Sequence, residues 1–126
     1  MLVLTRVAGE GDKKSGVELK YGGKEMRLFL SAIRDDTLEV AVKAGPEIGI
    51  TRNDLPVERD GETVVLELVC GQADDVSVFT LDFGGETCGV KAIARQGRQA
   101  KLGFDAPRSV QVRRLDAKQG PKDVPV

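Results

Sequence analysis

Apolar and polar residues alternate along several short segments of this chain, as they do in half-buried β-strands. Turn-forming pairs rich in Gly, Pro and Asp separate the segments, and no long stretch has the apolar spacing of a helix. We therefore predict an all-β fold of about ten short strands. The alternating segments are residues 2–6, 26–30, 38–42 and 48–52 in the first half, and 64–69, 88–94, 100–104 and 109–113 in the second.

The two halves of the chain resemble each other at a fixed offset of 62 residues. Such an internal repeat indicates two similar units of about 60 residues each. Because a unit of that size buries only a marginal core alone, we expect the two units to pack as one body. Residues that meet identical partners at this offset include the pairs Leu4/Leu66, Ser15/Ser77, Gly22/Gly84, Ala44/Ala106 and Arg52/Arg114.

The repeat predicts how the chain is organised. Residues 1–55 form the first repeat, 56–62 a connecting loop, 63–117 the second repeat, and 118–126 a flexible tail containing Gly and Pro. The connection has the length of a hairpin loop, so we predict that strand 48–52 pairs antiparallel with strand 64–69. Pseudo-twofold symmetry then predicts that strand 2–6 pairs with strand 109–114, which would bring the chain ends side by side.

Composition excludes several classes of chemistry. The chain of 126 residues contains no histidine, so it cannot build a Ser-His-Asp or Cys-His nucleophile or a histidine metal site. Its two cysteines are expected to be free, partly buried thiols. We expect no enzymatic activity, no cofactor and no metal. The chain shows no long apolar run and no signal-peptide pattern, so a cytoplasmic protein without a membrane partner is expected.

Two segments resemble the carbon storage regulator family (CsrA/RsmA). The opening Met-Leu-Val-Leu-Thr-Arg is similar to the start of that family, and residues 99–114 are similar to its fourth and fifth strands with the Ala-Pro turn between them. Residues 37–52 carry a weaker version. The resemblance implies small homodimers whose first and last strands pair between subunits, and which regulate translation by binding mRNA leaders that contain GGA.

By this resemblance, the chain is a tandem-fused, divergent, single-chain pseudo-dimer. Two intertwined five-stranded repeats would form one β-sandwich or barrel-like body that is monomeric in solution. Two departures are evident. About eight additional residues near 11–20 and 73–82 predict a longer hairpin or loop in each repeat, and Pro and Gly residues after each last strand predict that the family's C-terminal helix is absent or minimal.

The resemblance also implies a composite RNA site that joins the first strand to residues of the second repeat. Seven of the residues between positions 88 and 114 are basic and only Asp105 is acidic, which favours contact with phosphate. Arginine also suits guanine edges and base stacking. The predicted site residues are Leu4, Thr5, Arg6, Arg98, Gln99, Lys101, Ala106, Pro107, Arg108, Val110, Val112, Arg113 and Arg114.

The corresponding second site is predicted not to bind RNA, because Leu68 replaces the first-strand arginine and acidic residues such as Glu39 replace the basic ones. The predicted function is therefore a sequence-specific, RNA-binding regulator of translation with one site. The alternative is a protein-interaction module that has lost RNA binding and docks a partner at the acidic face. Two simpler interpretations stay open: Arg6 and Arg114 as a surface charge pair, and the acidic run as a solubilising surface.

Overall fold

The computed structural model describes residues 1–9, 15–59, 61–71, 74–116 and 120–123. Within these residues the chain is built from β-strands and a single helical turn, which confirms the prediction of an all-β fold. The elements are β1 (Leu2–Val7), β2 (Gly16–Tyr21), β3 (Lys24–Arg34), β4 (Thr37–Ala44), β5 (Gly49–Arg52), β6 (Leu55–Pro56), β7 (Thr63–Val69), α1 (Asp74–Ser77), β8 (Val78–Asp82), β9 (Thr87–Gln96), β10 (Gln99–Asp105), β11 (Gln111–Asp116) and β12 (Gly120–Asp123).

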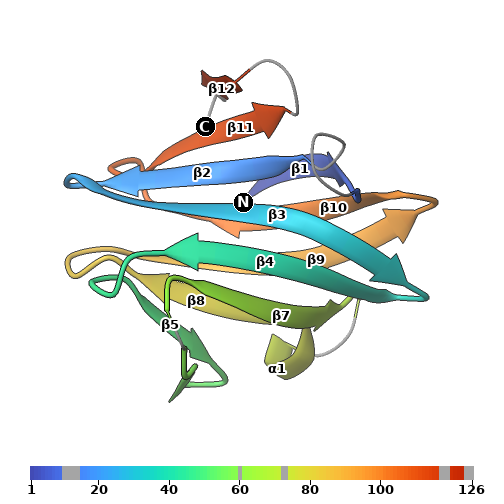
Figure 1. Cartoon of the computed structure of the whole chain (residues 1–126), viewed down its shortest axis with the longest axis horizontal. Helices are drawn as coiled ribbons and strands as arrows, with labels where there is room; N and C mark the ends of the chain where they lie inside the picture. Colours follow the sequence, from blue (N-terminus) through green and yellow to red (C-terminus); the bar gives the residue numbers. More distant parts are fainter. Residues whose placement is uncertain (10–14, 60, 72–73, 117–119, 124–126) are drawn as a thin grey trace.

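The strands form two antiparallel sheets that face each other (Figure 1). Sheet A has the order β1-β10-β9-β8-β5-β6, and sheet B has the order β12-β11-β2-β3-β4-β7. Both sheets are open, since each begins and ends on a strand with one hydrogen-bonded neighbour in the described chain. The molecule is therefore a sandwich, and the barrel-like alternative is wrong.

Each sheet contains strands from both halves of the chain. Three consecutive strands of one half form its centre, and strands of the other half flank them on both sides. In sheet A the central β8, β9 and β10 lie between β1 and β5; in sheet B the central β2, β3 and β4 lie between β7 and β11. The two orders match when the chain is shifted by 62 residues, so the sequence repeat corresponds to a pseudo-twofold arrangement of strands.

This exchange corrects both strand pairings predicted from the sequence. β5 pairs with β8 and β6 rather than with β7, and β7 pairs with β4. β1 pairs with β10, and β11 pairs with β2 and β12. The physical reason is that a connection of this length can cross between layers about 10 Å apart as easily as it can close a hairpin.

Arg59 holds the connection in this crossing path. Its guanidinium donates hydrogen bonds to the backbone oxygens of Ala44, Gly45 and Ile48, at 2.8, 3.0 and 2.6 Å. The segment after β5 is thereby fixed to the turn between β4 and β5. The chain then runs to sheet B, where the backbone oxygen of Glu62 accepts a hydrogen bond from the amide of Ala44 at 2.9 Å.

One apolar core lies between the sheets and is shared by both repeats. Its fully buried side chains include Leu19, Leu28, Phe79, Leu81 and Phe104, contributed by strands of both sheets. Alternate residues of each strand enter this core, as the period-two pattern predicts. Both free cysteines, Cys70 and Cys88, are also buried in it.

The segments predicted outside the main strands also join the sheets. β2 and β8 lie in the two segments predicted to form a longer hairpin or loop, and each pairs antiparallel with the strand that follows it. The tail predicted as flexible contains β12, which pairs with β11; the rest of that tail lies outside the described residues. The family's C-terminal helix was predicted to be absent or minimal after each last strand, and the described chain has β6 and β12 at these places.

Among the described residues, no helix is long and apolar enough to cross a membrane.

Candidate nucleic-acid interface

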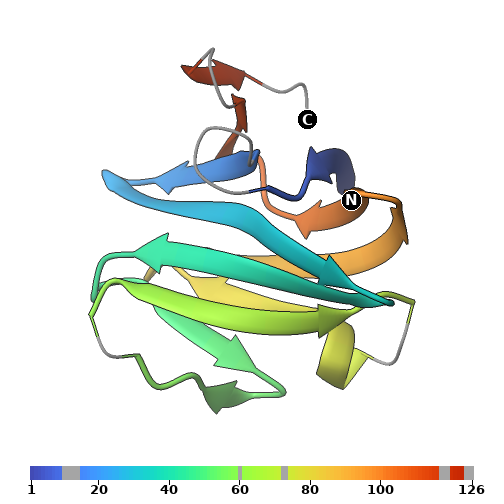
Figure 2. The same cartoon turned by 45° about the vertical axis from the view of Figure 1, so that its right-hand side comes forward.

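β1 and β11 come from opposite ends of the chain and lie at the same rim of the sandwich, one in each sheet (Figures 1 and 2). β1 is the edge strand of sheet A, whereas β11 lies beside β2 in sheet B. A contact across the rim defines this arrangement: Arg6 Nη1 on β1 donates a hydrogen bond to the backbone oxygen of Gly16 on β2 at 3.2 Å. β1 thus contacts sheet B across the gap between the sheets, and it is not paired with β11 within one sheet.

The apolar members of the predicted site form the floor of this rim. Leu4, Val110 and Val112 are only 6, 1 and 2 % exposed, so they belong to the core. Arg114 pairs with Val17 in the register of β11 and β2, and paired residues leave the same face of a sheet. The Arg114 side chain therefore leaves the face of sheet B that is directed toward sheet A, and it is exposed there because β11 lies close to the open rim.

Arg6 is part of the frame of the rim. Its side chain is only 5 % exposed, and besides Gly16 it donates through Nε to the backbone oxygen of Thr5 at 2.6 Å. The guanidinium thus satisfies carbonyls of both sheets where their edges meet. Since an unsatisfied buried carbonyl is costly, we assign Arg6 a structural contribution to this rim.

The outer face of sheet A presents polar and basic side chains. Thr5 pairs with Lys101, and Val7 pairs with Gln99, in the register of β1 and β10. Lys101, Thr5 and Gln99 are exposed. They line a shallow hollow of about 160 Å³. The complete lining consists of Thr5, Ala94, Arg95, Gln96, Gln99, Ala100 and Lys101.

The remaining predicted residues lie in two turns that border these surfaces. Arg98, between β9 and β10, donates from Nη2 to the backbone oxygen of Ala8 at 3.1 Å and is otherwise exposed. Ala106 and Pro107 are partly buried between β10 and β11, while Arg108 is exposed beside them. The amide of Val110 closes this turn by donating to the oxygen of Pro107 at 3.0 Å.

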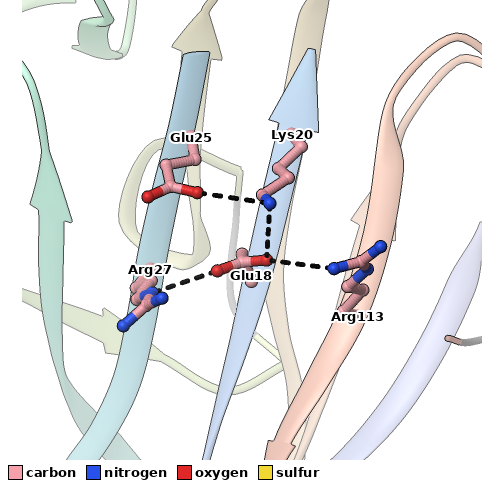
Figure 3. Close-up of polar contacts among 5 residues, drawn as sticks. All are labelled: Glu18, Lys20, Glu25, Arg27 and Arg113. Atoms are coloured by element: carbon pink, nitrogen blue, oxygen red, sulfur yellow. Dashed lines mark hydrogen bonds and ion pairs between the residues drawn. The ribbon is translucent and has the colours of Figure 1, made fainter. Parts of the chain in front are cut away.

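Arg113 lies on a different surface from Arg114, because neighbouring residues of a strand face opposite sides of the sheet. It pairs in register with Glu18 on the outer face of sheet B, where its Nη1 lies 4.0 Å from Glu18 Oε1 (Figure 3). The Glu18 side chain is 2 % exposed and also faces Arg27 and Lys20. This set, with Glu25 beside Lys20, is called the Glu18 cluster.

The structure thus divides the predicted site into the rim, the outer face of sheet A with its two turns, and Arg113 in the Glu18 cluster. It also adds Arg95 and Gln96 to the hollow, which sequence reasoning did not include in the site. The pairing of β9 and β10 shifts by one residue between Lys101 and Leu102. Such a β-bulge re-aims the following side chains, and strict alternation does not reveal it.

The pseudo-symmetric surface on sheet B has the opposite charge. Glu67 and Glu39 occupy the positions of Thr5 and Lys101, and they pair directly with each other. Arg34 offsets part of this charge, since its guanidinium lies 2.8 Å from Glu39 and 4.0 Å from Glu67. At the corresponding rim Leu68 is fully buried in the position of Arg6. Arg52 donates to the backbone oxygen of Val76 at 2.9 Å.

No group of three or more Cys, Asp or Glu side chains within the described ranges is placed to hold a metal ion. Comparisons with known proteins leave the resemblance resting on the residues alone: no family model, no curated protein and no solved structure matches the chain.

Proposed function

We propose that this protein binds RNA through the outer face of sheet A and the adjoining rim, and that it regulates the translation of mRNAs whose leaders contain GGA. The fold class and the separate basic surface support this proposal, and the sequence resemblance supplies the GGA element. One RNA site per chain is proposed.

The observation that carries the proposal is a charge contrast between matching positions of one scaffold. Both repeats contribute the same strands to the sandwich, so packing alone does not require their surfaces to differ. Residues 88–114 nevertheless carry seven cations and one acid, whereas the matching residues 26–52 carry four of each. An excess of cations is expected of a surface that meets phosphate. Lys91, Arg95, Arg98, Lys101, Arg108, Arg113 and Arg114 correspond to Phe29, Ile33, Asp36, Glu39, Pro46, Thr51 and Arg52.

Each exposed group has a proposed role. Lys101 and Arg108 contact phosphates, because ammonium and guanidinium groups neutralise the backbone without reading its sequence. Arg114 reads a base edge or stacks on a base, since its planar guanidinium is suited to both and it is exposed at the rim. Thr5 and Gln99 supply hydrogen bonds beside Lys101. Arg6 acts as a positioning residue, and Arg113 is assigned to the Glu18 cluster.

The phosphate role is tested with Lys101→Ala and the control Lys43→Ala. Both lysines are exposed, Lys101 on β10 and Lys43 on β4, which is the corresponding strand of the first repeat. Binding to a hairpin RNA with GGA in its loop is measured by fluorescence anisotropy at several salt concentrations. We expect Lys101→Ala to weaken binding and to reduce the slope of log K against log salt by about 0.7–1, the loss of one phosphate contact. Lys43→Ala should change neither quantity. Equal effects of both variants would contradict the assignment.

The base-reading role is tested with Arg114→Ala and Arg52→Ala, which occupy matching positions of the two repeats. We expect Arg114→Ala to cost about 1–3 kcal/mol, or roughly 5- to 150-fold in affinity, and to reduce discrimination against a scrambled loop. Arg52→Ala should leave affinity unchanged, since Arg52 belongs to the repeat surface that is predicted not to bind RNA and donates to the backbone oxygen of Val76. Similar losses at both positions would refute a single site.

The acidic surface favours one alternative function, a protein-interaction module. Two glutamates directly opposite each other on neighbouring strands are unfavourable unless they meet a cation, and among the described residues Arg34 is the cation that pairs with them. A basic protein partner would relieve that repulsion. Absence of measurable affinity for every hairpin RNA tested would favour this alternative over the first proposal.

A further inference from the structure

β1 and β7 are the first strands of the two repeats, and each is an edge strand of its sheet. Their backbone groups have different side-chain partners. An edge strand presents backbone N–H and C=O groups that can pair with another chain, and proteins usually cover or blunt them. In β1 the amide of Val7 donates a hydrogen bond to Ser15 Oγ at 2.7 Å. The oxygen of Thr5 is bonded by Arg6 Nε.

β7 lacks a counterpart of Arg6. Position 68 holds Leu, which has no donor and is fully buried, so it cannot bond the oxygen of Glu67 as Arg6 bonds that of Thr5. The outer face of β7 exposes an apolar side chain, Val65, to 54 %, as β1 exposes the matching Val3 to 46 %. A strand of this length with an apolar centre is a favourable template for pairing.

The direction of the β7 backbone groups follows from its ends. Glu62 accepts from Ala44, and Cys70 donates to Asp36, so even-numbered positions face β4. The register of β7 and β4 continues without a shift between them. Backbone groups of the odd-numbered positions 63, 65 and 67 therefore point away from the sheet, because these groups alternate in direction along a strand.

We propose that β7 pairs antiparallel with β7 of a second copy of this chain, about a twofold axis through Val65. The two copies of sheet B then form one continuous sheet, and Val65 of each copy packs against its symmetry mate. The pairing is isologous and closes after two chains. It uses only residues 63–67, because α1 lies against the far end of β7.

The charges favour this register over its neighbours. With Val65 on the axis, Glu67 of one copy lies opposite Thr63 of the other, and Lys43 pairs with that Thr63 on the adjoining strand. Two glutamates of each copy, Glu39 and Glu67, are thereby placed in one row with the lysine of the partner copy. A register centred on Glu67 would instead place two like charges directly opposite each other, which is destabilising.

The proposed interface leaves the basic surface accessible. β7 and β1 belong to different sheets, and Figure 2 shows β7 in the lower part of the molecule with β1 and β11 in the upper part. The dimer and the RNA site are therefore independent properties, and either can fail without the other.

The test replaces Val65 with Pro, which removes an amide that points away from β4 and leaves the pairing within the molecule intact. Its matched control is Val3→Pro, the corresponding position on β1. Sedimentation equilibrium of the full chain should give a concentration-dependent mass approaching twice 13.5 kDa. Val65→Pro should shift the dimer dissociation constant upward by at least about tenfold, whereas Val3→Pro should leave it unchanged.

The register is tested at Thr63, which is exposed in the single chain. Thr63→Lys should tighten the dimer by placing a cation opposite Glu67, and Thr63→Glu should weaken it. Circular dichroism and the affinity for a GGA hairpin RNA confirm that each variant remains folded. A wild-type chain that is monomeric up to about 1 mM, or equal losses from Val65→Pro and Val3→Pro, would overturn the proposal.

Discussion

Positions 6 and 68 match in the two repeats and are both buried, but they hold different side chains. Leu68 fills its position with apolar volume and is fully buried, whereas Arg6 is buried through its stem and bonds backbone oxygens of both sheets. The sequence alone indicates a cation at position 6 but does not show that neighbouring carbonyls already use it. That information depends on how closely the edges of the two sheets approach, which is a property of the assembled sandwich.

Cys88 provides a residue-scale prediction on pH. Burial raises the pKa of its thiol from the ordinary value of 9.0 to about 11, and the nearby Glu86 and Asp105 carboxylates add to the shift. The unfolded chain therefore loses this proton first. The free energy of unfolding keeps this contribution in full below about pH 9 and loses it as the pH rises toward 11.

This prediction is measured by urea denaturation of the wild type and Cys88→Ala at pH 8 and pH 10. The wild type should lose more stability between the two pH values than the variant, since other groups titrating in this range are common to both. Burial also raises the pKa of the Cys70 thiol, so Cys70→Ala should reduce the loss of stability in the same direction, and Cys88→Ala is the variant that isolates Cys88. A drop of the same size in wild type and Cys88→Ala would show that the thiol is not the group responsible.

At the scale of elements, most strands follow from alternation, whereas their partners do not. β3, β4, β9 and β10 were predicted from their pattern, and β3 pairs with β4 as β9 pairs with β10. The outer strands exchange between repeats, because either sheet offers a similar apolar edge and the short connections reach both. Gln99 and Lys101, which the resemblance placed in the site, are exposed on β10, while the position of Arg113 depends on the pairing of β11 with β2.

The Glu18 cluster links β2 to β11, a strand that comes from the other repeat. Glu18 on β2 meets Arg113 of β11 on one side and Arg27 of β3 on the other, with Arg27 Nε 3.0 Å from its carboxylate. The corresponding row of sheet A consists of Thr51, Thr80 and Gly89 and carries no charge. The cluster is thus a feature of the β2–β11 pairing that the pseudo-symmetric β8–β5 pairing does not have.

We expect Glu18→Gln to lower the free energy of unfolding by about 1–3 kcal/mol, because it removes the buried charge that accepts from Arg27 and lies beside the partly exposed Lys20 and Arg113. The control is Glu25→Gln, whose side chain is 51 % exposed and lies 3.5 Å from Lys20 of the same cluster; exposed pairs of this kind contribute less than about 1 kcal/mol. Chemical denaturation with an unchanged m-value measures both. A Glu18→Gln chain as stable as the wild type would show that the cluster does not stabilise the pairing of β2 with its neighbours.

At the scale of the whole molecule, duplication within one chain permits an asymmetry that two identical subunits cannot have. One surface has accumulated cations and its counterpart acids, while the shared core keeps both repeats apolar at matching positions. A single chain with one RNA site cannot bridge two RNA elements. The proposed pairing of β7 strands would supply a second site at the far end of the dimer and with it the avidity of two linked sites.

The most direct test of the proposed function is a calorimetric titration of the unmodified chain with a GGA hairpin RNA and with a scrambled hairpin, at two salt concentrations. We expect one RNA bound per chain, preference for the GGA hairpin, and weaker binding at the higher salt concentration. Equal affinity for both hairpins, two RNAs bound per chain, or no binding at the lower salt concentration would contradict the proposal of a single, sequence-reading basic site.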